Sequence, residues 1–238
     1  MTVRFAAIGA LIASLTIGLA SNVLFLAAFQ FRIDWFLDPL KVISAGPLSA
    51  ELLRWASVLD LIGYYLATGV LAYALWRVLR PRDPVLADLS TLAAIGYTVA
   101  GGTAAAVLAM IGPMLMEQHT NASGVDQTTV EMQFALLFEG VWRSVWQLFD
   151  GILLGAWWLG IGLLLRRDHP LVSRISLALA GAAAIGVVFN ILGLDLARDV
   201  TLGAVFTLWT AWWLLLLSAF LRNRAPFTTL TQTRPQVR

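Results

Sequence analysis

Residues 59–94 read LDLIGYYLATGVLAYALWRVLRPRDPVLADLSTLAA: an apolar run, a turn with arginines and prolines, and a second apolar run. The first run extends back to residue 52, and an α-helix of about 20 apolar residues crosses the hydrocarbon of a membrane. Basic side chains gather at the membrane edge, and proline is common at the first position of a new helix. The stretch therefore predicts two spanning helices joined by a short turn.

The same pattern recurs along the chain of 238 residues, of which 59% are hydrophobic and 13% are charged. Segment 5–30 begins like a signal peptide, but its apolar run is longer than a signal core, so a retained helix is expected. The predicted fold class is all-α: one domain over residues 1–222, a polytopic bundle of six transmembrane helices, with a polar cytoplasmic tail at 223–238. The predicted spans are 5–30, 52–76, 87–116, 132–165, 172–194 and 200–221.

Composition excludes several functions. The chain has no cysteine, which rules out disulfides and thiolate metal sites, and its net charge of +2 is spread thinly, which argues against nucleic acid as a partner. His119 and His169 fall on opposite sides of the predicted membrane, so they cannot both ligate one haem. No metal and no cofactor are expected.

Charge also predicts orientation. Of the 16 lysines and arginines, eleven lie on the side of the N-terminus, four lie on the other side, and Arg143 lies inside the fourth segment. Basic loops stay in the cytoplasm, so both termini are expected there, in the inner membrane of a bacterium.

Residues 149–180, FDGILLGAWWLGIGLLLRRDHPLVSRISLALA, repeat the pattern of residues 59–94. Asp60 aligns with Asp150, and an offset of two spans gives the two units the same direction. Each aspartate precedes the next arginine cluster by 16 or 17 residues. At ~1.5 Å per residue this is about 25 Å, near the outer edge of a hydrocarbon core of ~30 Å. A parallel repeat of helices two–three and four–five is therefore predicted.

Charges in the fourth segment suggest a polar stripe. At ~100° per residue, Glu139, Arg143 and Asp150 project within about 40° of one another. Glu139 and Arg143 lie ~10 to 16 Å further out than Asp150, beyond the hydrocarbon, where a solvated helix face is expected. The start of this helix is predicted to stand outside the bilayer, or to break near Gly140.

Asp60 and Asp150 are the strongest candidate site residues. One hypothesis gives them a shared, outward-facing polar vestibule that binds a ligand, with Arg54, Tyr64, Glu139 and Arg143 around them. A second hypothesis makes each aspartate a structural cap, which pairs with an arginine (Arg54, Arg143 or Arg198) or hydrogen-bonds to Tyr64, Tyr65, Gln147 or Asn190. Both fit the sequence.

Three stretches carry a resemblance: DPLKVISAGPLSAELLRWASVLDLIGYYL, WRVLRPRDPVLADLSTLAAIGYTVAG and LLLRRDHPLVSRISLALAGAAAIG. Together with a last helix rich in Trp and Leu, they resemble a bacterial domain-of-unknown-function family of six-helix membrane proteins. The resemblance covers about residues 5–222. It implies the topology and assigns no site residue.

The expected function is non-catalytic: a ligand-binding or accessory subunit whose partners are membrane lipids, a lipophilic small molecule or a larger membrane complex. One alternative is an integral membrane enzyme that uses Asp60 and Asp150 as acid and base. Another is a small proton-coupled transporter.

Overall fold

The computed structural model describes residues 3–32, 34–35, 38–222 and 227. Within them, six helical segments are long and apolar enough to cross a membrane: Val3–Ala28, Pro47–Leu79, Pro84–Asn121, Val125–Leu164, Pro170–Ile191 and Asp195–Leu221. The predicted all-α class and six-span bundle are confirmed, and the chain is a multi-pass membrane protein. Apart from Phe227, the predicted tail lies outside the described residues.

Three of the spans described here change from α-helix to π-helix and back. The first consists of α1 (Val3–Ala13), η1 (Ser14–Gly18) and α2 (Leu19–Ala28). The second consists of α4 (Pro47–Asp60), η3 (Leu61–Leu66) and α5 (Ala67–Leu79), and the fourth of α7 (Val125–Glu139), η4 (Gly140–Phe149) and α8 (Asp150–Leu164). The uninterrupted spans are α6 (Pro84–Asn121), α9 (Pro170–Ile191) and α10 (Asp195–Leu221).

Proline begins several helices, as the sequence predicts. Pro84 and Pro170 open α6 and α9 after the two arginine-bearing turns, and Pro39 opens the short helix α3 (Pro39–Ile43). Asp83 also caps α6, because its Oδ1 accepts a hydrogen bond from the backbone N–H of Leu86 at 3.0 Å.

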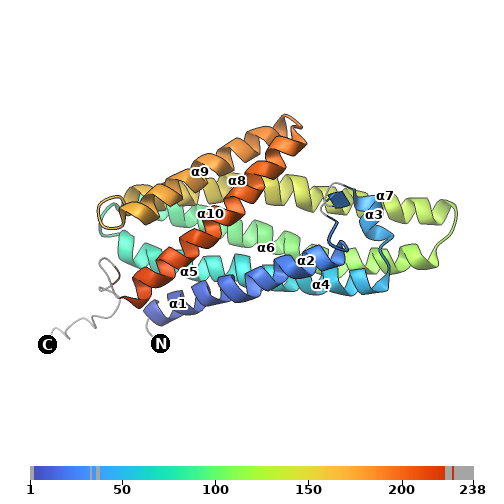
Figure 1. The fold of residues 1–238 in the computed structure, drawn as a ribbon, viewed down its shortest axis with the longest axis horizontal. Helices are drawn as coiled ribbons and strands as arrows, with labels where there is room; N and C mark the ends of the chain where they lie inside the picture. Colours follow the sequence, from blue (N-terminus) through green and yellow to red (C-terminus); the bar gives the residue numbers. More distant parts are fainter. Residues whose placement is uncertain (1–2, 33, 36–37, 223–226, 228–238) are drawn as a thin grey trace.

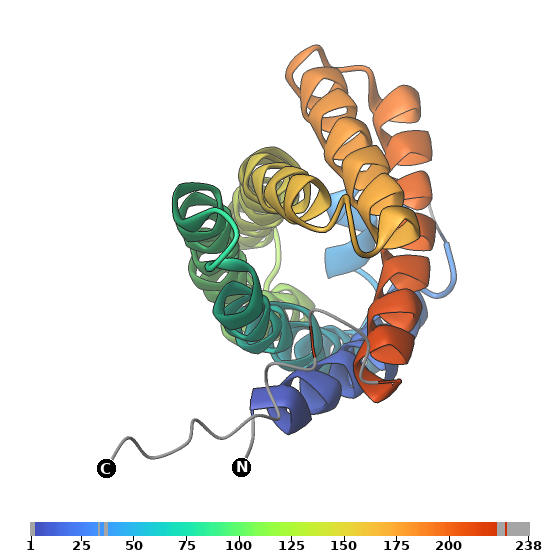
Figure 2. The ribbon, with the colours of Figure 1, turned by 90° about the vertical axis from the view of Figure 1, so that its left-hand side faces the viewer.

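The six spans form a ring in chain order. Each contacts the next, and α10 returns to contact α1; Figure 2 looks along this ring. Arg4, near the start of α1, donates from Nε to the carbonyl of Phe220 at 3.1 Å and from Nη2 to that of Leu221 at 3.1 Å. The first and last helices are therefore joined at one end of the bundle, as an even number of spans requires (Figure 1).

Side chains fill the ring as two apolar cores. The first, at the end where α1 begins, contains the fully buried Trp157, Trp158, Trp212 and Trp213. The second packs α2, α3 and the start of α4 against α6 and α7, and contains Phe29, Phe134 and Phe138. The polar residues considered below lie between the two cores.

Two spans are much longer than the membrane core. The segment Val125–Leu164 has 40 residues and Pro84–Asn121 has 38, which is about 57 to 60 Å against a hydrocarbon thickness of ~30 Å. Figure 1 shows α6 and α7 extending together beyond the other spans. The fourth span does not break near Gly140; it continues there as a π-helix.

Candidate functional site

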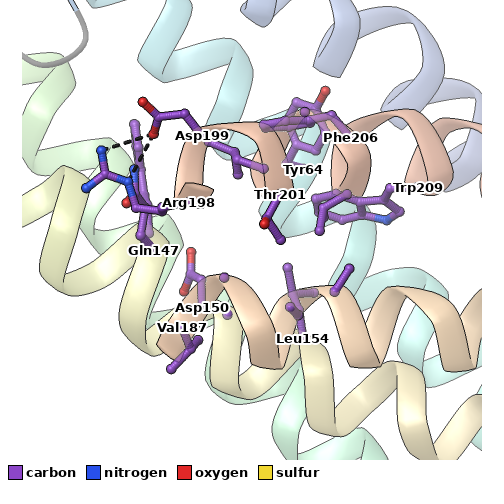
Figure 3. Close-up of a pocket in the computed structure, with 18 of the residues that line it drawn as sticks. Tyr64, Gln147, Asp150, Leu154, Val187, Arg198, Asp199, Thr201, Phe206 and Trp209 are labelled. Carbon is purple, nitrogen blue, oxygen red and sulfur yellow. Dashed lines mark hydrogen bonds and ion pairs between the residues drawn. The ribbon is translucent and has the colours of Figure 1, made fainter. Parts of the chain in front are cut away.

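A cavity of about 500 Å³ lies within the ring, and all six spans contribute to its wall. Polar residues gather at one end, where Figure 3 shows Gln147, Asp150, Arg198 and Asp199. Apolar and aromatic residues form the rest. A volume between 300 and 1,000 Å³ is typical of sites that enclose a small organic molecule.

Asp150, the first residue of α8, is deeply buried in this wall, with 3% of its surface exposed. Its Oδ2 accepts a hydrogen bond from the Tyr65 hydroxyl at 3.0 Å. Its Oδ1 has no hydrogen-bond partner among the described residues. A buried carboxyl oxygen that lacks a partner is costly, so a group that hydrogen-bonds to this atom would stabilise the site.

Asp60, the last residue of α4, lines the same cavity and is 9% exposed. It forms no hydrogen bond or ion pair within the described chain, and its carboxyl interacts electrostatically with that of Asp150. The structure therefore brings the two aspartates to one cavity and gives neither of them an arginine partner.

Gln147 of η4 adds an unpaired amide. The side chain is 8% exposed, and neither its Oε1 nor its Nε2 has a partner in the described part of the chain. The indole N–H groups of Trp158 and Trp209, which also line the cavity, are likewise unpaired there. Residues of the cavity wall therefore carry both donors and acceptors that have no partner among the described residues.

Arg198 of α10 is the one basic residue in the described lining, and it is 2% exposed. Its guanidinium binds Asp195 through Nη1 at 2.6 Å, and its Nε donates to Asp199 at 3.0 Å. This cation is therefore already neutralised by two carboxylates at the edge of the cavity (Figure 3).

Aromatic rings cover the rest of the wall. Trp209 lies between Trp158, with ring centroids 5.1 Å apart, and Tyr64, at 5.4 Å. Tyr65 and Tyr97 are 4.7 Å apart, and the Tyr64 hydroxyl accepts a hydrogen bond from Asn22 Nδ2 at 2.6 Å. The cavity is thus an aromatic chamber with carboxyl groups at one end.

The π-helical turns position both aspartates. Asp60 directly precedes η3 and Asp150 directly follows η4. π-helical turns inside α-helices frequently occur at functional sites. Gly63 of η3 lies so close to the Gly18 backbone of η1 that an added Cβ would overlap it.

Three of the predicted vestibule residues, Asp60, Asp150 and Tyr64, line the cavity, and the other three do not. Arg54 instead pairs with Glu51 at 3.1 Å, and Glu139 pairs with Arg143, whose Nη1 lies 3.6 Å from Asp195. The predicted common stripe fails because η4 has i→i+5 hydrogen bonds, so the spacing of 100° per residue does not hold.

The sequence did not place Gln147, Tyr97, Arg198 or Asp199 in the vestibule, although Gln147 and Arg198 were expected as possible partners of the aspartates. Arg198 and Asp199 carry a signal, since they are charges at the beginning of an apolar helix. Gln147 and Tyr97 carry none beyond their helical position. His119 lies elsewhere, 3.0 Å from both Glu131 Oε1 and Gln127 Nε2.

Comparison with known proteins gives no match to any family model, curated protein or solved structure.

Proposed function

We propose that this protein is a non-catalytic membrane protein that binds a lipophilic molecule in the cavity, with the polar group of that molecule against Asp60, Asp150 and Gln147. The observation that carries the proposal is the set of buried, unpaired polar atoms on the wall of an aromatic cavity. Buried polar groups in folded proteins nearly always have partners. A ligand group that bonds to these atoms would supply them.

The opening of the cavity supports a ligand that arrives through the bilayer. Gly203 and Phe206 of α10 both line the cavity and are exposed, so the cavity reaches the surface beside α10, where Figure 1 shows this helix diverging from α2. Phe206 precedes Arg222 by 16 residues, about 24 Å at the rise of an α-helix, within a core of ~30 Å. The neighbouring exposed residues are apolar, with Val23 at 57% and Val200 at 67%.

The proposal also includes the membrane and the orientation in which the protein lies. The cluster of arginines beside the ends of α1 and α10 favours a cytoplasmic location for that end, in the inner membrane of a bacterium. The resemblance to a six-helix bacterial family fits this setting and adds no activity to it.

Two glycines of α9 provide the test. A Cβ on Gly186, in the cavity wall, would contact only Thr201, at 3.5 Å, whereas one on Gly181 of the same helix would meet nothing within 4 Å. Gly186→Phe should therefore fill the cavity and Gly181→Phe should not. Native mass spectrometry in mild detergent should detect a lipophilic molecule on the wild type and on Gly181→Phe, and not on Gly186→Phe.

The same bound molecules on all three proteins, or none on any together with equal thermal stability, would contradict the proposal. Recovery of the added ligand in chemically altered form would favour the enzyme alternative. Ligand-driven proton movement into vesicles that contain the protein would favour the transporter alternative.

A further inference from the structure

We propose that the cavity selects a lipophilic cation, of the substituted-ammonium or phosphonium class, over neutral and anionic molecules of the same shape. The inference rests on the proposed binding function and specifies its ligand. Three observations carry it: the charge of the lining, the kind of polar atoms left unpaired, and the aromatic faces.

The described lining carries an excess of acidic groups. Asp60, Asp150 and Asp199 contribute three carboxyls against the one guanidinium of Arg198. Arg198 is already bound to Asp199 and to Asp195 outside the lining. Asp60 and Asp150 therefore remain without a basic partner. A neighbouring cation stabilises a buried carboxylate, and no basic side chain of the described lining supplies one to Asp60 or Asp150, so a cationic ligand would.

The unpaired carboxyl atoms are acceptors. Asp150 Oδ1 and the Asp60 carboxyl have no donor, whereas the Tyr65 hydroxyl already donates to Asp150 Oδ2. An anionic group placed here would lie near two carboxyls, while the guanidinium of Arg198 is already paired with Asp195 and Asp199. Gln147 can donate or accept, so it does not oppose a cation.

The aromatic walls suit the same ligand. Faces of Trp and Tyr attract a cation within about 6 Å of the ring centre, and the attraction increases when water is excluded. Trp209 and Tyr64 line the cavity and are 4% and 3% exposed, so both rings are shielded from bulk water. An apolar body next to them and a positive centre near the aspartates would satisfy both parts of the cavity.

A pair of ions of equal shape gives the sharpest test. Tetraphenylphosphonium and tetraphenylborate have the same size and geometry and opposite charges. Labelled tetraphenylphosphonium should bind the purified protein saturably, whereas labelled tetraphenylborate, measured in a separate sample because the two ions form an insoluble salt, should not. Neutral triphenylphosphine oxide should compete poorly.

Asp60→Asn and Asp150→Asn, which keep the shape of each side chain, should each weaken phosphonium binding by roughly tenfold or more, since a close charge pair contributes at least ~1.4 kcal/mol. Glu51→Gln is the matched control, because Glu51 is an exposed carboxylate outside the cavity, and it should bind as the wild type does. Should either Asn variant fail to fold, the separate binding measurements of the two ions on the wild type decide alone.

Equal binding of both ions overturns the inference, as does binding that both Asn variants leave unchanged. Equal competition by the neutral oxide would show that the carboxyls are protonated donors to a neutral ligand. The outcome also separates the two proposals. If tetraphenylphosphonium does not bind while Gly186→Phe still removes a copurified molecule, the proposed positive charge of the ligand is wrong and the proposed binding function stands. If both tests fail, both proposals fail.

Discussion

Gly101 of α6 determines how closely Tyr65 and Asp150 approach that helix. An added Cβ would overlap the ring of Tyr65 and the carboxyl of Asp150, so only glycine permits the hydrogen bond between them in this position. A stripe of small residues, Gly101 to Ala106, predicts close helix packing from sequence. Only the folded structure shows that this stripe makes room for the buried carboxyl of Asp150.

Gly101→Ala should therefore destabilise the protein by about 1–3 kcal/mol, the usual cost of overpacking a tight interior. For a chain of this size that is a fall in melting temperature of roughly 2–4 °C per kcal/mol. Gly181→Ala is the control: its Cβ meets nothing, and alanine is the better helix former. Thermal unfolding in detergent measures both, and equal melting temperatures would refute the packing assigned to Gly101.

At the level of whole helices, the sequence predicts the position of each span well, and it predicts the π-helical turns and side-chain partners within the spans poorly. Apolar length, arginine clusters and Pro84 or Pro170 are local signals, so they locate helices and turns. A π turn such as η3 or η4 depends on packing between helices, and nothing in the local pattern marks it. Asp60 and Asp150 were predictable as charges in apolar runs. Tyr65 was one of several expected partners, and only the fold, through a contact 85 positions away, selects it for Asp150.

The joint between α1 and α10 yields a second prediction. The last carbonyls of a helix lack partners within it, and Arg4 supplies a charged donor to those of Phe220 and Leu221. Arg4→Met keeps the apolar stem and removes both bonds, so we expect a loss of about 1–2 kcal/mol. Arg174→Met changes an exposed arginine of α9 and should cost little. Chemical denaturation in mixed micelles compares them, and an equal effect of the two would show that the joint contributes nothing.

For the whole molecule, the ring explains why a polar cavity persists inside an apolar chain. Each span buries one face against its neighbours, and the contact of α10 with α1 closes the circle. The two apolar cores lie on either side of the cavity, and the wall between them carries the acidic groups.

The orientation of that ring is the last prediction. The α6–α7 connection and the α8–α9 turn lie at opposite ends of the bundle (Figure 1), and the eleven-to-four bias of basic residues assigns the second to the cytoplasm. The chain has no native cysteine, so single cysteines report cleanly. A cysteine at Ser123, exposed between α6 and α7, should react with a membrane-impermeant maleimide in intact cells. One at Arg167, exposed in the α8–α9 turn, should react only after the cells are permeabilised. The opening beside α10 is about 24 Å from the arginine-rich end, so it belongs to the half of the bilayer far from that end. The opposite labelling pattern would reverse the predicted orientation, and it would place the opening in the other leaflet.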